Sequence, residues 1–402
     1  MDLGFDGRYG GTVAGKQEFN AIVRSVKKSI KTGGWQTASE AKAFEEESAA
    51  FLGVKHGILT TSGSAAGLLA LSAMELPKGS EVIIPAVTFP TIFNIILQCG
   101  LMPVVVDCKV GTYNIDLDKL SEAITDKTRA IIAVHAVGNP VDMPRLMEMV
   151  LSINIGRARG HQKPILVLED NCDGWGSSIN GKMVGSFGHV SITSFHAAHI
   201  ISTGGTGGGV YTNDSDLAKR VRMYRDWGRQ ADTNEPNKYP EIPSDYNPRF
   251  VYEKIGYNFQ ILEAQAAMGR VQLKKANKIK KARQRNYEYL VNKLSGLPTL
   301  TLPSPIPNAD ICWFALPLST TGDRGYLVRE LEAAGIETRS MFAGNIIKHP
   351  AYWDSVYRIG NDLSGANEIM RKSFWITVHP RLRKKDLDYI VNVFENVLKY
   401  NR

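Results

Sequence analysis

Short apolar runs alternate with helix-like stretches along the first half of the chain. Runs rich in apolar or β-branched residues have the length of buried strands, and they span residues 57–60, 81–85, 103–107, 130–135, 164–169, 190–195 and 208–212. Helical patterning lies between them, for example over residues 65–74 and 91–99. Apolar strands separated by helices are typical of a largely parallel sheet that is buried on both faces. The pattern therefore predicts an α/β fold that binds its ligand at the carboxyl ends of the strands.

The pattern and composition of the sequence change near Gln272. A long helical pattern studded with lysine and arginine continues through residues 290–294, and a proline-rich stretch over 298–307 follows it. Strands around 313–318 and a helix over 386–397 come next. We therefore expect a large domain of residues 1–270 and a smaller C-terminal α+β domain of residues 271–402. The polar, proline-rich residues 229–250 indicate an ordered functional loop or a subunit contact.

Composition narrows the class of protein. The net charge of +8 is scattered in short groups without a nucleic-acid motif, so we expect solvated helix faces, or attraction of anionic ligands, and no nucleic-acid partner. The first residues lack the pattern of a secretory leader, and no apolar run is long enough to cross a bilayer. The four cysteines, at positions 99, 108, 172 and 312, have neither disulfide-framework nor metal-site spacing. These features predict a reduced, cytoplasmic protein without a membrane partner.

Residues 61–66 (TSGSAA) join the strand at 57–60 to the helix at 65–74. Free backbone N–H groups and the helix dipole make such a turn an anion site, and Gly63 lets a phosphate approach closely. An ordinary capped helix explains the same residues equally well.

Acidic residues follow the apolar strand that ends at Leu168. Asp170 is in position to pair with a protonated ring nitrogen, which a pyridine cofactor needs in order to act as an electron sink. Asp173 comes three residues later and can lie on the same side of the turn. Helix capping by Asp170 is the alternative interpretation.

The segment from Ser194 to His199 (SFHAAH) precedes a glycine-rich turn at 204–209. Polar side chains beside flexible backbone suit a ligand site. Two histidines could bind a metal, but no carboxylate or cysteine stands at ligand spacing nearby, so we expect no metal site. Histidines satisfied within the core are the other alternative.

Taken in order, these motifs resemble the DegT/DnrJ/StrS sugar aminotransferase family. The matching segments are FLGV at 51–54, SGSAA at 62–66, PAVTF at 85–89, Glu169-Asp170, SFH at 194–196, GYN at 256–258 and EAQAA at 263–267. The resemblance implies a fold-type I pyridoxal-phosphate (PLP) enzyme, whose larger domain, here 1–270, binds the cofactor.

The resemblance also implies a role for each motif residue. Phe89 would stack on the cofactor ring, with packing in the core as the alternative. Asp170 would pair with the ring nitrogen, and Asp173 would lie near the ring hydroxyl. The phosphate would be held by Ser64, Ala65 and Ser194, and by Asn258 of a neighbouring subunit, which implies a homodimer with shared active sites. Candidates for the substrate diphosphate or a co-substrate carboxylate are Arg225, Arg229 and Arg339, with surface salt bridges as the alternative.

His199 stands where the family carries the lysine that binds the cofactor covalently. No lysine occurs between Lys182 and Lys219, and an imidazole cannot form that link, although it can act as a general base. This exchange resembles the nucleotide-sugar 3-dehydratase branch. Further matches to that branch are GTYNID at 111–116, His135 with GNP at 138–140, RDWGR at 225–229 and TRSMFAGN at 338–345.

The branch implies dehydration at C3 of a nucleotide-linked 4-keto-6-deoxyhexose, with pyridoxamine phosphate (PMP) as cofactor and L-glutamate as amino donor. The CDP-sugar enzymes of the branch carry a two-iron, two-sulfur cluster whose cysteines follow the RDWGR motif. Here that motif is followed by Gln230 and by residues 231–233, none of them cysteine, so we expect no cluster and a mechanism like that of the GDP-sugar enzymes. A downstream reductase stays open as a partner.

One departure from the family pattern leaves other functions open. The turn at 203–208 reads TGGTGG, whereas the family has a Gly-Glu-Gly-Gly turn one residue shorter. A family member that binds ligand without turnover, or an aminotransferase with atypical chemistry, are the alternatives to the dehydratase.

Overall fold

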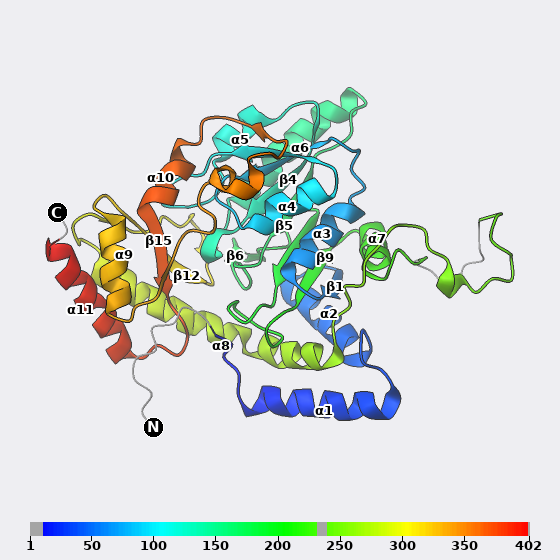
Figure 1. Cartoon of the computed structure of the whole chain (residues 1–402), viewed down its shortest axis with the longest axis horizontal. Helices are drawn as coiled ribbons and strands as arrows, with labels where there is room; N and C mark the ends of the chain where they lie inside the picture. The colour runs from blue at the N-terminus through cyan, green and yellow to red at the C-terminus, as the bar shows by residue number, and fades with distance from the viewer. Residues whose placement is uncertain (1–10, 231–238, 401–402) are drawn as a thin grey trace.

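The computed structural model describes residues 11–230 and 239–400, and a large sheet lies at its centre (Figure 1). The strand order is β1-β9-β8-β5-β4-β2-β3-β14. The bounds are β1 His56–Thr60, β2 Glu81–Pro85, β3 Met102–Val106, β4 Thr128–Val134, β5 Leu166–Asp170, β8 Val190–Ser194, β9 Gly208–Thr212 and β14 Arg358–Ile359. Strand β9 runs opposite to the other strands of this sheet, so its pairings with β1 and β8 are antiparallel and the remaining pairings are parallel. The predicted, largely parallel sheet is confirmed.

The side chains of β2 alternate between two hydrophobic cores. Val82 and Ile84 belong to the core with α3 (Gly63–Ala73) and α4 (Pro90–Gln98). Ile83 belongs to the core with α5 (Leu117–Ala123) and α6 (Met143–Arg159). Because both faces are covered, each strand position needs an apolar side chain, which explains the unbroken apolar runs.

A second, antiparallel sheet organises the C-terminal part of the chain. Its order is β10-β12-β15-β13, with bounds β10 Leu300–Thr301, β12 Ala315–Thr320, β13 Thr338–Arg339 and β15 Ser373–Thr377. Its core includes side chains of α9 (Arg324–Ala333), α11 (Lys384–Tyr400) and the second half of α8 (Glu263–Leu294). Helix α10 (Ser364–Lys372) precedes β15. This arrangement agrees with the expected α+β architecture.

Helix α8 runs from the large sheet to the C-terminal part and packs against α1 (Lys16–Thr32) and α2 (Ser39–Leu52) (Figure 1). Helix α8 begins at Glu263, earlier than the lysine- and arginine-rich pattern that starts near Gln272. The pattern missed this start because the first turns of the helix carry buried alanines instead of lysines. The expected boundary between residues 270 and 271 therefore falls inside this helix. The C-terminal part also contributes β14 to the large sheet, which the two-domain division did not predict.

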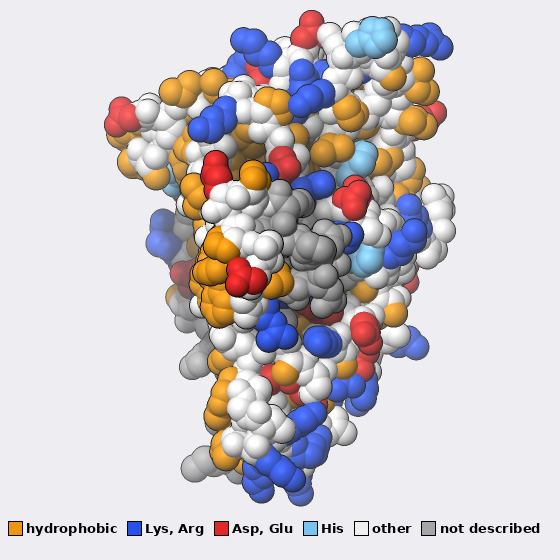
Figure 2. All heavy atoms as spheres, turned by 90° about the vertical axis from the view of Figure 1, so that its right-hand side faces the viewer, with side chains coloured by type: hydrophobic (Ala, Val, Ile, Leu, Met, Phe, Trp, Pro, Cys, Tyr) orange, Lys and Arg blue, Asp and Glu red, His pale blue; other side chains and the backbone are white. Residues whose placement is uncertain are grey.

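A segment with many exposed hydrophobic side chains follows α7 (Ser215–Arg225). Of the expected loop at 229–250, residues 231–238 lie outside the described part; Arg229 pairs with Tyr252 as an isolated bridge. Figure 2 looks onto the side from which this segment projects, where hydrophobic and charged side chains lie intermixed. The exposed hydrophobic residues are Trp227, Tyr246, Phe250, Tyr252, Ile255 and Leu262.

Smaller elements complete the described part of the chain. The strands β6 (Ser178–Ile179), β7 (Lys182–Met183) and β11 (Ala309–Asp310) form a third sheet. Single turns of 3₁₀ helix span Ala136–Gly138, Pro248–Phe250, Ile346–Lys348 and Pro350–Tyr352. Among the described residues, no helix has the length and apolar character needed to span a bilayer.

Candidate active site

A cavity of about 840 Å³ opens at the carboxyl ends of β4, β5 and β8, where the sequence predicts a ligand site. A volume of this size is in the range of cofactor and ligand pockets. The expected site residues on its wall are Ser64, Phe89, Asp170, Asp173, Ser194, His199 and Arg339. The C-terminal part closes the cavity with Phe314, Ser340, Phe342, Ala343, His349 and Trp375.

The N-terminus of α3 forms one end of this cavity. Ser62 caps the helix by accepting a hydrogen bond from the Ala65 N–H at 3.0 Å. A Cβ on Gly63 would lie 2.7 Å from the Cβ of Ser194, so only glycine lets the helix end approach β8 this closely. The first turn of α3 and the hydroxyls of Ser64 and Ser194 line this end of the cavity, which is the arrangement of an anion site at a helix N-terminus. The structure thus brings Ser64 and Ser194 together at the position expected for a phosphate.

Phe89 and Asp170 line the cavity between the helix end and the histidines. Phe89 precedes α4 and is 55% exposed, so packing in the core does not account for it. Asp170 ends β5 and accepts a hydrogen bond from the Cys172 N–H at 3.1 Å. Burial raises the pKa of its carboxyl group. A buried carboxyl group of this kind gains from a cationic partner, such as a protonated ring nitrogen.

His199 is held by a tight turn after β8. Phe195 packs in the core against Phe44 and Trp175, and the His199 N–H donates to the carbonyl of His196 at 3.0 Å. The Nδ1 atom lies 3.1 Å from the carbonyl oxygen of Ser194. Because a carbonyl only accepts, Nδ1 carries the hydrogen and Nε2 has the free lone pair.

Asp173 faces that lone pair. Its Oδ1 atom lies 3.5 Å from the Nε2 of His199. Burial, with the charge of His196 next, lowers the pKa of His199 to about 4. Burial and the neighbouring Asp170 raise the pKa of Asp173 to about 8. The two groups form a coupled pair in which the imidazole is neutral at neutral pH.

The unusual glycine turn at 203–208 is tied down by two threonines. The Thr203 hydroxyl donates to the carbonyl of Thr206, and the Thr206 hydroxyl donates to the carbonyl of Thr61. Gly207 has a φ of +141°, and a Cβ there would lie 2.1 Å from the Thr203 Oγ1. Thr206 and Gly207 line the cavity. The altered turn therefore places Thr206 on the cavity wall, where its hydroxyl is bonded to the residue that precedes the α3 cap.

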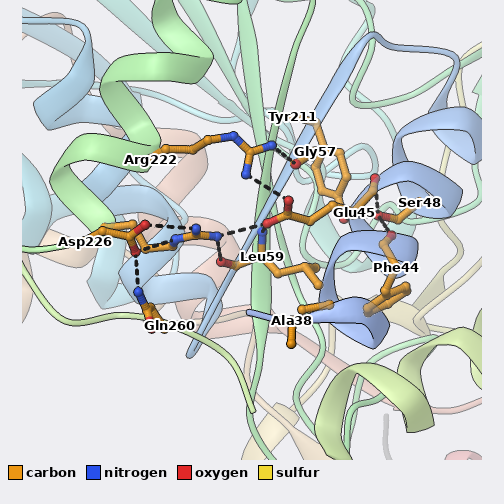
Figure 3. Close-up of polar contacts among 12 residues, drawn as sticks. Ala38, Phe44, Glu45, Ser48, Gly57, Leu59, Tyr211, Arg222, Asp226 and Gln260 are labelled. Carbon is orange, nitrogen blue, oxygen red and sulfur yellow. Dashed lines mark hydrogen bonds and ion pairs between the residues drawn. The ribbon is translucent and has the colours of Figure 1, made fainter. Parts of the chain in front are cut away.

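Arg225 lies away from the cavity, in a buried ion-pair network at the end of α7. Its guanidinium contacts Glu45 and Asp226, each at 2.9 Å, and donates to the Leu59 carbonyl at 3.2 Å. Arg222 joins this network through an ion pair with Glu45, and Gln260 joins it by donating a hydrogen bond to Asp226 (Figure 3). The structure gives Arg225 the role of a buried salt bridge in place of the expected substrate contact.

The other expected residues fall into two groups. Arg339 reaches the cavity wall from β13 and also pairs with Glu337. Arg229, Asn258 and Ala65 are not on that wall. Arg229 lies over the Trp227 ring at 5.2 Å, Asn258 is exposed, and Ala65 lines a smaller hollow between α3 and α4.

His349 and Phe314 line the cavity, although no sequence motif singled them out. The Nε2 of His349 donates to the Ala343 carbonyl at 2.6 Å, which fixes its ring next to the expected SMFAGN segment. Phe314 meets the His199 ring edge-on at 5.7 Å between centroids. Neither lies in a motif, and only proximity to residues 338–345 pointed toward His349.

The site fits a pyridoxal-type cofactor. A helix N-terminus approached through Gly63, an exposed aromatic ring and a buried carboxyl group lie around one cavity. These three features match the phosphate, ring and ring nitrogen of such a group. The fold and the site together define a fold-type I PLP-dependent protein.

Comparison with known proteins gives the family. The profile of the DegT/DnrJ/EryC1/StrS aminotransferase family matches residues 16–395, and the chain belongs to this family. A dTDP-4-dehydro-2,6-dideoxy-D-glucose 3-dehydratase of Saccharopolyspora spinosa is 36% identical over 407 residues, which cover 96% of this chain and 85% of that protein. The lipopolysaccharide biosynthesis protein RfbH of Salmonella typhimurium is 35% identical, with 97% and 91% covered.

A solved structure of similar fold binds the expected cofactor. The E. coli GDP-4-keto-6-deoxy-D-mannose 3-dehydratase with bound hydrated PLP superposes with a TM-score of 0.85 at 29% identity, and 96% of this chain and 99% of that chain are covered. The predicted family, fold class and cofactor class are confirmed. Since the family includes aminotransferases, membership alone does not assign the reaction.

Proposed function

We propose that this protein removes the C3 hydroxyl group from a nucleotide-linked 4-keto-6-deoxyhexose, with PMP as its cofactor. The observation that carries this proposal is His199, which lines the cavity at the sequence position of the aminotransferase lysine and whose Nδ1 atom is occupied by the Ser194 carbonyl. 3-Dehydratases among the relatives support it. Failing that reaction, the chain is a binding protein of the family or an atypical aminotransferase.

Each residue of the cavity has a task in this proposal. The bound cofactor supplies an amino group for the 4-keto carbon and an electron sink for the elimination. Ser64, Ser194 and the α3 N-terminus hold its phosphate, Phe89 covers its ring and Asp170 pairs with the ring nitrogen. His199 takes a proton at Nε2, and Asp173 faces the same atom. Arg339 at the cavity wall binds an anionic group of the substrate or co-substrate.

Further partners belong to the same proposal. We place Asn258 at a homodimer interface, where it reaches the partner's cofactor phosphate, and Ala65 with Ser64 and Ser194 at the phosphate of its own subunit. The exposed hydrophobic side chains on the segment around Asn258 support such an interface. L-Glutamate regenerates the cofactor, a separate reductase is the candidate that consumes the product, and no iron–sulfur cluster takes part. The free cysteines fit a cytoplasmic enzyme of deoxysugar or lipopolysaccharide biosynthesis.

The test uses the purified protein with PMP, L-glutamate and GDP-, CDP- and dTDP-linked 4-keto-6-deoxyhexoses. We expect ammonia release and a 3-deoxy product, detected by mass spectrometry, with one of them. Absence of both across the panel would favour the binding protein. Covalent fixation of PLP to the chain by borohydride would contradict the role of His199, because that reaction requires an amine.

A further inference from the structure

Arg283 is a buried arginine for which the described residues provide no ion pair. It lies on α8 and is 2% exposed. Its Nη1 atom donates to the carbonyls of Phe314 at 2.7 Å and Trp313 at 3.3 Å, whereas its Nε finds no acceptor among the described residues. Burying such a charge without a carboxylate is costly, so its retention calls for a reason.

The contacts of Arg283 lead directly to the catalytic pair. Its guanidinium lies 6.0 Å from the centre of the Phe314 ring, and that ring lies 5.7 Å from the His199 ring. The Phe314 N–H donates to the carbonyl of Val137 at 3.0 Å. Val137 has a φ of +47°, a strained conformation for a β-branched residue, and lines the cavity beside Asp173. Arg283 thus fixes the residues that lead into β12, and these residues form the cavity wall next to His199.

We propose that Arg283 is a positioning residue for His199: it holds Phe314 against the imidazole, and its uncompensated charge favours the proton-free form of the His199–Asp173 pair. The proposal rests on the proposed function, because it gives the base a further determinant. Arg283 touches neither substrate nor cofactor and acts only through its neighbours.

The charges around the pair show the direction of this effect. His199 is faced by Asp173, His196 and Arg283, and Asp173 is faced by Asp170, Cys172 and Arg283. After burial and His196, Arg283 also contributes to the lowered pKa of His199. On Asp173, where burial raises the pKa, Arg283 opposes the rise. Both effects favour loss of a proton, so removal of the charge makes the pair keep its proton to higher pH.

The test is an NMR titration of the cofactor-free protein with labelled histidine, in which His199→Asn identifies the His199 signal among the eight histidines. We compare Arg283→Met and Arg283→Gln, which lose the charge, with Arg283→Lys, which keeps it. Arg270→Gln is the matched control, since Arg270 lies on the same helix but pairs with Glu40 and Glu47. The two neutral variants give two chances of a folded protein.

We expect the His199 signal to change at higher pH in each neutral variant that folds, and at the wild-type pH in the Lys variant and the control. In active protein, the acid limb of the pH profile of kcat/KM also moves to higher pH in the neutral variants. The proposal would be overturned if the His199 signal of a folded neutral variant changed at the same pH as that of the wild type, over the pH range in which both proteins are folded. Because the titration needs no substrate, it remains decisive even if no sugar in the panel reacts.

Discussion

Two arginines of this protein are buried to the same extent, 2% exposed, and differ in what surrounds them. Arg225 lies between Glu45 and Asp226. Burial lowers the pKa of Arg225, but the two carboxylates raise this pKa by more than burial lowers it, so the net shift is upward. Arg283 has carbonyls as its partners, and burial lowers its pKa to about 10. A compensated charge cross-links elements, whereas an uncompensated one extends its field to nearby titratable groups.

The largest expected effect lies on the Arg283 side of this comparison. We predict that His199→Asn lowers turnover by about two to four orders of magnitude, the usual contribution of a general base. Steady-state rates measure the loss, and cofactor binding by absorbance serves as the control and should persist. Wild-type rates in this variant would remove His199 from the reaction and Arg283 from any role in it.

For Arg225, we expect a substitution to change the free energy of unfolding. Arg225→Met removes one of the two counter-charges of the buried Glu45, which keeps Arg222, and leaves Asp226 with Gln260 as a neutral partner, so we predict a loss of about 3 kcal/mol in the free energy of unfolding. Denaturant titration measures this loss. Lys384→Met, which breaks the exposed pair with Asp388, is the matched control and should cause no measurable change. Equal losses in the two variants would mean that burial of the pair is not what matters.

The smallest expected effect sharpens the contrast. Arg283→Met removes donors from two carbonyls but also removes an uncompensated charge, so we predict a loss of only about 1–2 kcal/mol. The same denaturant titration decides. If the Arg283 and Arg225 variants lose equal stability, the distinction between compensated and uncompensated arginines fails.

Sequence reasoning succeeded where the signal was local. The runs at 81–85 and 208–212 coincide with β2 and β9, because a short run with apolar or β-branched residues at its centre is typical of a buried strand. It failed where partners lie far away in the chain. Nothing in the RDWGR motif shows that Arg225 will meet Glu45, which precedes it by 180 residues.

Arg283 was hidden for a related reason. It lies in a helix rich in lysine and arginine, whose charges were predicted to be solvated, and only the packing of α8 against the strand entry buries this one. The site motifs were recognised because they resemble a family, and their placement around one cavity required the structure.

The pairing of β14 with β3 has a consequence for synthesis. Arg358 reaches Glu81 across 277 residues of sequence, so the edge of the large sheet is completed only after β14 has left the ribosome. Until then, β3 presents unpaired backbone groups, which are prone to pair with other chains. Truncation near the C-terminus therefore threatens solubility during expression, even though the catalytic histidine is made long before.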